Sequence, residues 1–328
     1  MKAAVVPAMH SQWRIQEVPK PEPGPNQVLI RIRASGICYT DVHQTNGALP
    51  GNFPRILGHE PVGEIVAVGP GVTARKVGDR VGVPWIQTTC GRCEWCKRGK
   101  PMFCEQQVGT SGAAQGGHAE YMLAFAGATM LLPDGLSYEQ AAPIFCAGYT
   151  VWSGLRWADP QPGQRVAVAG IGGLGHLAVQ YAKAAGFDTI AISRSPDKDT
   201  LIRQLGADEI VRDGQGLARV GGADVILSTS NSTDAMADSI QGLRPDGRFV
   251  AMGFDPKPLQ LSLADLITRR IRIIGSQQNG PEYLYEALDL AAKGKVKVLA
   301  ETYRLDEINR AYERVEKGQV RFRAVVTD

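Results

Sequence analysis

The sequence lacks any uninterrupted hydrophobic run of the roughly 18 residues that a membrane-spanning helix requires, so we expect no membrane span. It also has little net charge, because 36 Lys and Arg residues face 33 Asp and Glu residues. That balance argues against nucleic acid or an anionic membrane surface as a partner. The first residues lack the apolar core and cleavage site of a signal peptide, and we therefore expect a cytoplasmic protein.

Cysteine is absent after Cys146, and the pattern of the sequence also changes in that half of the chain. Residues 1–140 contain short β-prone runs separated by turn-forming residues, which predict a β-rich, antiparallel, barrel-like arrangement. From Pro162 onward, strands alternate with helices, as is typical of βαβ units and a parallel sheet. A length of 328 residues fits two domains. The elements that we expect in the second half are strands at Arg165–Ala169, Thr189–Ser193, Glu209–Val211, Val225–Ser228, Arg248–Met252 and Phe322–Val326, and helices at Leu174–Ala185, Asp197–Leu205, Thr233–Leu243, Tyr283–Lys293 and Leu305–Lys317.

A glycine-rich turn follows the first of these strands and opens the first helix. It reads G-x-G-x-x-G and consists of Gly170, Ile171, Gly172, Gly173, Leu174 and Gly175. Such glycines let the backbone pass close to a pyrophosphate, and the helix N-terminus offers free N–H groups and the positive end of its dipole. A glycine-rich loop in a close-packed turn is the alternative, but the βαβ context favours dinucleotide binding.

The end of the second strand bears on the choice of dinucleotide. NAD sites usually carry an acidic residue there, which accepts hydrogen bonds from the adenosine ribose. This chain has Ser193 instead, followed by Arg194 and, nearby, Lys198. A small hydroxyl beside a guanidinium suits a 2′-phosphate, so we favour NADP(H) over NAD(H). The alternative interpretation of Arg194 is an exposed side chain in a solvated loop.

Four of the six cysteines fall within fifteen residues, at Cys90, Cys93, Cys96 and Cys104. A closed set of four thiolates around one ion is typical of structural zinc. Gly91 and Gly99 give the loop the freedom to wrap the ion. An iron–sulfur cluster, redox-active pairs and a nucleic-acid-binding zinc ribbon are the alternatives. Ferredoxin spacings differ from this one, and acidic residues offset the basic side chains nearby.

The remaining motifs occur together in one known family. Gly58–Gly63, Cys38–Asp41 with His43, the four-cysteine segment, Cys146–Gly148 and the glycine-rich turn resemble, in order and spacing, the zinc-containing alcohol dehydrogenases of the medium-chain dehydrogenase/reductase family. The resemblance covers essentially the whole chain and is greatest to the shorter yeast and bacterial members. It implies an α/β protein in which a Rossmann doubly wound parallel sheet, residues 148–281, is inserted into a β-rich GroES-like catalytic domain, residues 1–147 and 282–328.

The resemblance also implies two zinc ions per chain. One is held by the four clustered cysteines, and the catalytic one is held by Cys38, His59 and Cys146. By the same resemblance, Asp41 orients His59 through a hydrogen bond, and Glu60 lies beside the zinc. A carboxylate that merely stabilises a turn is the alternative interpretation of Asp41.

The resemblance further assigns a reaction and the residues that support it. The reaction is reversible hydride transfer between the nicotinamide and an alcohol or aldehyde. Thr40 is expected to contact the substrate oxygen, and His43 to be the outer base of a proton relay. Thr150 is expected to pack at the nicotinamide, and Arg323 to bind the pyrophosphate.

The expected substrate pocket includes Trp85 and Leu49, and Leu49 stands where the yeast enzyme has a larger Trp. We therefore expect medium-sized, including aromatic, aldehydes and primary alcohols rather than ethanol alone. An NAD-dependent alcohol dehydrogenase of broad range is the first alternative. An inactive zinc-binding or redox-sensing protein on the same fold is the second. We expect a homo-tetramer, with a dimer as the alternative.

Overall fold

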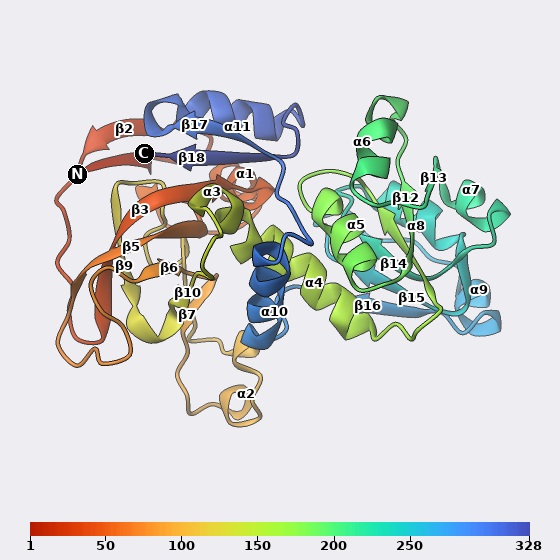
Figure 1. The fold of residues 1–328 in the computed structure, drawn as a ribbon, viewed down its shortest axis with the longest axis horizontal. Coiled ribbons are helices and arrows are strands. Elements are labelled where there is room, and N and C mark those ends of the chain that lie inside the picture. The colour runs from red at the N-terminus through yellow and green to blue at the C-terminus, as the bar shows by residue number, and fades with distance from the viewer. The chain divides into compact units, whose positions relative to one another are not determined.

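The computed structural model describes residues 1–328, and the chain divides into two compact units. Unit 1 comprises Met1–Cys146 and Val298–Asp328, and unit 2 comprises Ala147–Lys297. We expected the return to the first domain at residue 282, whereas the structure has it at Val298. The reason is that α10 (Pro281–Ala292) packs against α4 (Ala147–Ala158) within unit 2 (Figure 1).

The main sheet of unit 1 is organised around one long strand, β3 (Gln27–Ile37). Along its length β3 pairs antiparallel with β5 (Glu60–Val68), and its other edge pairs first with β9 (Tyr121–Phe125) and then with β18 (Arg323–Thr327). Its inward side chains, including Val28 and Ile30, join a buried aliphatic cluster. The sheet order is β10 (Met130–Leu131), β6 (Arg80–Gly82), β5, β3, β18 and β17 (Ala300–Arg304).

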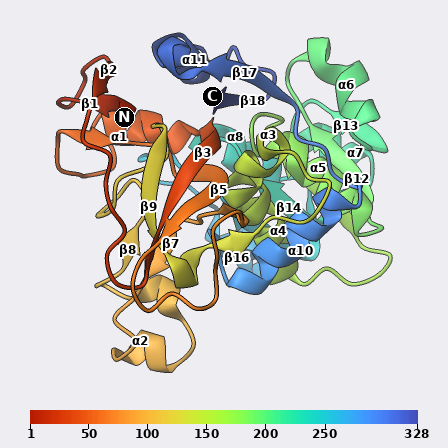
Figure 2. The same cartoon turned by 60° about the vertical axis from the view of Figure 1, so that its left-hand side comes forward.

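One pair in this sheet, formed by strands from the C-terminal segment, is parallel, whereas the antiparallel arrangement was expected for residues 1–140. Strands β17 and β18 run parallel, with Thr302 opposite Val325. The helix α11 (Ile308–Glu316) connects them and packs on both strands (Figure 2), so the connection is a βαβ crossover rather than a hairpin. The remaining elements of unit 1 are β1 (Lys2–Val6), β2 (Arg14–Glu17), β4 (Arg55–Ile56), β7 (Ile86–Thr88), β8 (Val108–Gly109), α1 (Tyr39–Thr45), α2 (Glu94–Lys97), α3 (Tyr138–Ala141), and the 3₁₀ turns η1 (Pro101–Phe103), η2 (Ala126–Ala128), η3 (Ala142–Phe145) and η5 (Leu305–Glu307).

Unit 2 is built on a six-stranded sheet in which every pair is parallel. The strand order is β13 (Glu209–Val211), β12 (Asp188–Ile192), β11 (Arg165–Ala169), β14 (Ala223–Ser228), β15 (Leu243–Ala251) and β16 (Arg272–Gly275). This 3-2-1-4-5-6 order is that of the doubly wound dinucleotide-binding fold. The helices are α4, α5 (Gly175–Ala184), α6 (Asp199–Gln204), α7 (Gly214–Arg219), α8 (Thr233–Ile240), α9 (Leu263–Thr268) and α10, with the 3₁₀ turn η4 (Pro196–Lys198) before α6.

The sequence pattern missed helices α4, α7 and α9 and strand β16 of unit 2. Helix α7 is the clearest case. The segment contains Gly214 and Gly216, and glycine disfavours helix by roughly 1 kcal/mol relative to alanine. Asp213 compensates as the N-cap, because its carboxylate accepts a 2.6 Å hydrogen bond from the Gly216 N–H. None of the helices in the structure is long and apolar enough to span a bilayer.

Candidate functional site

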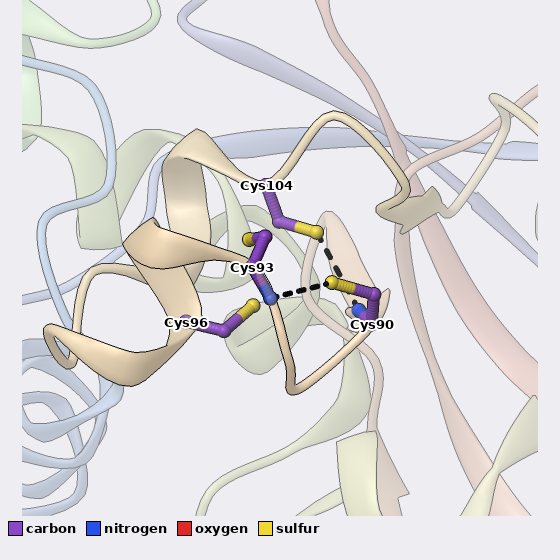
Figure 3. Close-up of side chains that lie close together, drawn as sticks. All are labelled: Cys90, Cys93, Cys96 and Cys104. Carbon is purple, nitrogen blue, oxygen red and sulfur yellow. Dashed lines mark hydrogen bonds between the residues drawn. The ribbon is translucent and has the colours of Figure 1, made fainter.

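The four clustered cysteines gather at one point of unit 1, and we call this segment, residues 90–104, the cysteine lobe. Their sulfur atoms all lie within 4.8 Å of one another (Figure 3). The Cys93 N–H donates to Cys90 Sγ at 3.3 Å, and the Cys90 N–H donates to Cys104 Sγ at 3.4 Å. Backbone N–H donors lower the pKa of Cys90 to about 6. Four free sulfurs so placed are the donor set that a tetrahedral zinc ion requires.

A second set of metal-ligating side chains is buried in the same unit. Cys38 stands at the N-terminus of α1, His59 directly precedes β5, and Cys146 follows η3. Cys146 Sγ lies 3.9 Å from Cys38 Sγ and 3.3 Å from His59 Nε2. We call these three residues the buried set; the Glu60 carboxylate lies within 4.8 Å of their ligand atoms. Two thiols and an imidazole fit zinc, with Glu60 as a further oxygen donor.

Asp41 links the two segments that carry the first members of the buried set. Its Oδ2 accepts a 2.8 Å hydrogen bond from the Cys38 N–H, and its Oδ1 accepts a 3.1 Å bond from the Gly58 N–H. Oδ1 also lies 3.8 Å from Nδ1 of His59, which leaves Nε2 facing Cys146. The two groups are therefore neighbours, but at 3.8 Å the predicted hydrogen bond is not formed, and the orienting role stays a prediction. Burial opposes ionisation of Asp41, but the imidazoles of His118 and His59 hold the pKa of its carboxyl well below the usual range.

His118, which no sequence motif singled out, lies beside this carboxylate, with its Nε2 3.9 Å from Asp41 Oδ1. The available signal was the pair Gly116-Gly117 before it. Added Cβ atoms there would lie 2.3 Å from Leu57 O and 2.4 Å from Pro61 Cβ. The glycines therefore let residues 116–118 approach residues 56–58 closely.

Arg323 lies beside Glu60, where it forms a buried ion pair. The register explains the meeting, because Glu60 on β5 and Val325 on β18 both stand opposite Gly36 of β3. Burial raises the pKa of the Glu60 carboxyl to about 7, against the opposing charge of Arg323. The Arg323 side chain is thus only 4 % exposed and is paired with the Glu60 carboxylate. Binding of a pyrophosphate by Arg323 stays a prediction.

The predicted relay and pocket residues lie around the buried set. Thr40 Oγ1 is 3.6 Å from Cys38 Sγ, and the Trp85 ring lies 5.4 Å from the His59 ring. His43 is half-buried, and its carbonyl accepts a 2.9 Å hydrogen bond from the Leu49 N–H. Burial lowers the pKa of His43, which the nearby Cys38 opposes. The structure therefore brings all of these residues to one region of unit 1.

The glycine-rich turn of unit 2 lies at the ends of β11, β12 and β14. Gly170 has a φ of +89°, and a Cβ added at Gly175 would lie 2.0 Å from the Gly170 oxygen. The Gly170 N–H donates to the Ile192 carbonyl at 3.3 Å, and Thr229 donates its hydroxyl to the Gly170 carbonyl. Nothing lies within 4 Å of a Cβ added at Gly172, so the space above the turn is open. This is the geometry that a pyrophosphate needs.

The other predicted cofactor residues lie in the same unit. Ser193 follows β12 and is buried, whereas Arg194 is exposed. Lys198 Nζ lies 3.4 Å from the Ile171 carbonyl of the glycine-rich turn, and Thr150 is buried in α4.

Family models and similar proteins all point to the alcohol dehydrogenases. Residues 24–134 match the alcohol dehydrogenase GroES-like domain, and residues 173–293 match the zinc-binding dehydrogenase domain. The chain is 42% identical to an alcohol dehydrogenase of Geobacillus stearothermophilus, over 99% of each chain. An alcohol dehydrogenase of Rhizobium meliloti is 41% identical, over 99% of this chain and 98% of that protein.

Solved structures agree with this assignment. The alcohol dehydrogenase of Aeropyrum pernix matches with a TM-score of 0.92 and 32% identity over all of both chains. An acetophenone reductase of Geotrichum candidum in complex with NAD matches at 0.90 and 30% identity, over 100% of this chain and 97% of that one. These comparisons confirm the expected GroES-like and Rossmann domains. The chain therefore belongs to the zinc-containing alcohol dehydrogenases of the medium-chain dehydrogenase/reductase family and is itself an alcohol dehydrogenase.

Proposed function

We propose that this alcohol dehydrogenase transfers hydride between NADP(H) and a primary alcohol or aldehyde of medium size, including aromatic ones. The observation that carries the cofactor preference is the end of β12, where Ser193 stands in place of a carboxylate and Arg194 is exposed beside it. A guanidinium can form charge-assisted hydrogen bonds with a 2′-phosphate, which a carboxylate would repel.

A nearby acidic side chain is already engaged. Asp199 pairs with Arg212 through a 2.9 Å contact from Nη1 to Oδ1, and the same guanidinium donates to the Ser193 carbonyl at 3.0 Å. The charge of Asp199 is thus compensated next to the proposed phosphate site. NAD(H) remains the alternative, since the similar acetophenone reductase was solved with NAD.

Parallel assays of kcat/KM with NADPH and NADH test this preference. We expect NADPH to be favoured and Arg194→Ala to reduce kcat/KM for NADPH at least about tenfold, with little change for NADH, because a charge-assisted bond is worth roughly 1.5–3 kcal/mol. Arg203→Ala, at an exposed arginine of α6, is the matched control and should change neither value. A tenfold preference of the wild-type enzyme for NADH would overturn the proposal.

We also propose two zinc ions per chain, one in the cysteine lobe and one held by Cys38, His59 and Cys146. When bound at the buried set, zinc supplies a Lewis acid that polarises the substrate oxygen. Thr40 would hydrogen-bond that oxygen, and His43 would pass the alcohol proton toward water. Metal analysis should find about two zinc ions per chain. A single zinc, lost when the cysteine lobe is altered, would refute the proposed zinc at the buried set.

The proposed substrate range depends on the pocket walls. Leu49 is half-buried and smaller than Trp, so Leu49→Trp should reduce kcat/KM for benzaldehyde-sized substrates more than for acetaldehyde. Equal effects on both substrates would contradict the proposed pocket. The assay measures a panel of aldehydes with NADPH.

For the assembly we propose a homo-tetramer, with a dimer as the alternative, in the cytoplasm. Strand β16 is a sheet edge whose Ile273 is exposed, and Leu263 and Ile267 of α9 are more than 70 % exposed. Exposed apolar side chains beside a free strand edge suit a second copy of the chain. Sedimentation equilibrium tests this assembly, and a monomer would refute it. The proposed cytoplasmic location is supported by the six cysteines, which are all free thiols and all fall in the two sets of potential metal ligands.

A further inference from the structure

His118 is a buried imidazole that packs close to Trp13 and Gly58. The backbone N–H of His118 donates to the Leu57 carbonyl at 3.0 Å. The Trp13 ring lies 5.4 Å away between centroids. A Cβ added at Gly58 would lie 2.8 Å from His118 Cγ and Nδ1, so a larger residue at this position would clash with the ring. The absence of a side chain at Gly58 therefore makes room for this ring.

Burying the ring nitrogens of His118 at this position costs folding free energy. The residue is fully buried, and neither ring nitrogen has a hydrogen-bond partner. Leaving a buried polar group unpaired costs roughly 1–3 kcal/mol. A phenyl ring would fill the same space against Trp13 without that cost, so packing alone does not explain an imidazole here.

The Asp41 carboxylate lies next to the imidazole, with its Oδ1 3.9 Å from His118 Nε2. The same oxygen lies 3.8 Å from His59 Nδ1 and accepts a hydrogen bond from the Gly58 N–H. Two imidazoles therefore flank one carboxylate oxygen, and one of them belongs to the buried set. Both separations are longer than a hydrogen bond, so the attraction is electrostatic.

We propose that His118 is a positioning residue that holds Asp41 Oδ1 toward Nδ1 of His59 and thereby strengthens retention of the metal at the buried set. The inference rests on the proposed zinc site. A residue that orients a histidine ligand changes metal affinity by roughly 10–100-fold. Because His118 acts on Asp41 rather than directly on the ligand His59, we expect it to change metal retention by the lower end of this range, about tenfold.

Two substitutions separate the polar role of the ring from its packing. His118→Phe keeps an aromatic ring between Trp13 and Gly58 but removes both nitrogens. His118→Gln keeps an amide nitrogen at about the reach of Nε2. Trp13→Phe is the packing control, because it alters the aromatic contact with the His118 ring and leaves the His118 nitrogens in place. It also removes the 3.1 Å hydrogen bond from Trp13 Nε1 to Thr45 Oγ1.

The experiment follows release of zinc from the loaded full-length enzyme into excess chelator, below the temperature at which any variant unfolds. The cysteine lobe is an internal reference within each chain. We expect His118→Phe to release zinc from the buried set about tenfold faster with the lobe unchanged, His118→Gln to recover most of the wild-type rate, and Trp13→Phe to leave both rates unchanged.

Several results would overturn the proposal. Wild-type rates in His118→Phe would do so, as would equal acceleration of both phases, which indicates general loosening of unit 1. Failure of His118→Gln to slow release relative to His118→Phe would also do so. If the wild-type enzyme holds zinc only in the lobe, the proposed function fails, and the inference fails with it; two zinc ions with unchanged rates would refute the inference alone.

Discussion

The buried ion pair between Glu60 and Arg323 can be tested by breaking it from either side. Both side chains are almost completely buried. Removing one partner leaves an uncompensated charge in a medium of low dielectric, which costs roughly 3–5 kcal/mol. We therefore expect Arg323→Met and Glu60→Gln each to destabilise unit 1 by about that amount. The double variant should recover at least about 2 kcal/mol of the summed loss, because no charge is then left unpaired.

The measurement is hydrogen exchange at the β3 amides of the zinc-loaded enzyme, because the two units need not unfold together. The matched control is the pair Arg314–Glu301 of the same unit, with 2.8 Å between Nη2 and Oε2. Its side chains are about one-third exposed, so breaking it should cost no more than about 1 kcal/mol. If Arg323→Met and Glu60→Gln each cost no more stability than breaking the control pair, and if their costs simply add in the double variant, the assigned role of the buried ion pair is wrong.

Three further predictions concern single residues. Burial lowers the pKa of His43 below its usual value, so more of its imidazole stays neutral in mildly acidic solution and wild-type alcohol oxidation should persist there. His43→Ala should lose roughly a hundredfold in kcat at low pH, with partial rescue by added imidazole, and a pH-independent loss would exclude the relay. A Cβ at Gly36 would lie 1.9 Å from Glu60 Oε2, so Gly36→Ala should destabilise by roughly 1–3 kcal/mol, measured by thermal unfolding, and an unchanged melting temperature would contradict this close approach. Cys104→Ser should remove one zinc ion per chain by metal analysis while the buried set keeps its own, and loss of both ions would show that the two sites are not independent.

Local patterns allowed the main features to be predicted. The cysteine lobe and the glycine-rich turn are each contained in fifteen or fewer consecutive residues, and each spacing fits the geometry of the group that it is expected to bind. Most of the alternating strands and helices of unit 2 were also predictable, because hydrophobic periodicity is local, but α4, α9 and β16 were missed. Helix α7 was missed because its two glycines conceal a helix that the Asp213 cap supports.

Contacts between distant segments could not be predicted in the same way. Arg323 and Glu60 are 263 residues apart, and only the shared register on β3 brings them together. His118 likewise reaches Asp41 because residues 116–118 pair with residues 56–58. Neither arrangement leaves a periodic signal, since each depends on which strands become neighbours in the folded sheet.

The position of β18 beside β3 has a consequence for biosynthesis. During translation β3, β5 and Glu60 emerge long before β18, with the whole of unit 2 made in between. Until Arg323 is made, the edge of β3 that β18 will occupy has unpaired backbone groups, and Glu60 lacks its counter-ion. Unit 2, by contrast, is continuous and can fold as soon as it emerges. The nascent chain should therefore complete its nucleotide-binding unit first, and the exposed β3 edge is where chaperones would protect it from aggregation.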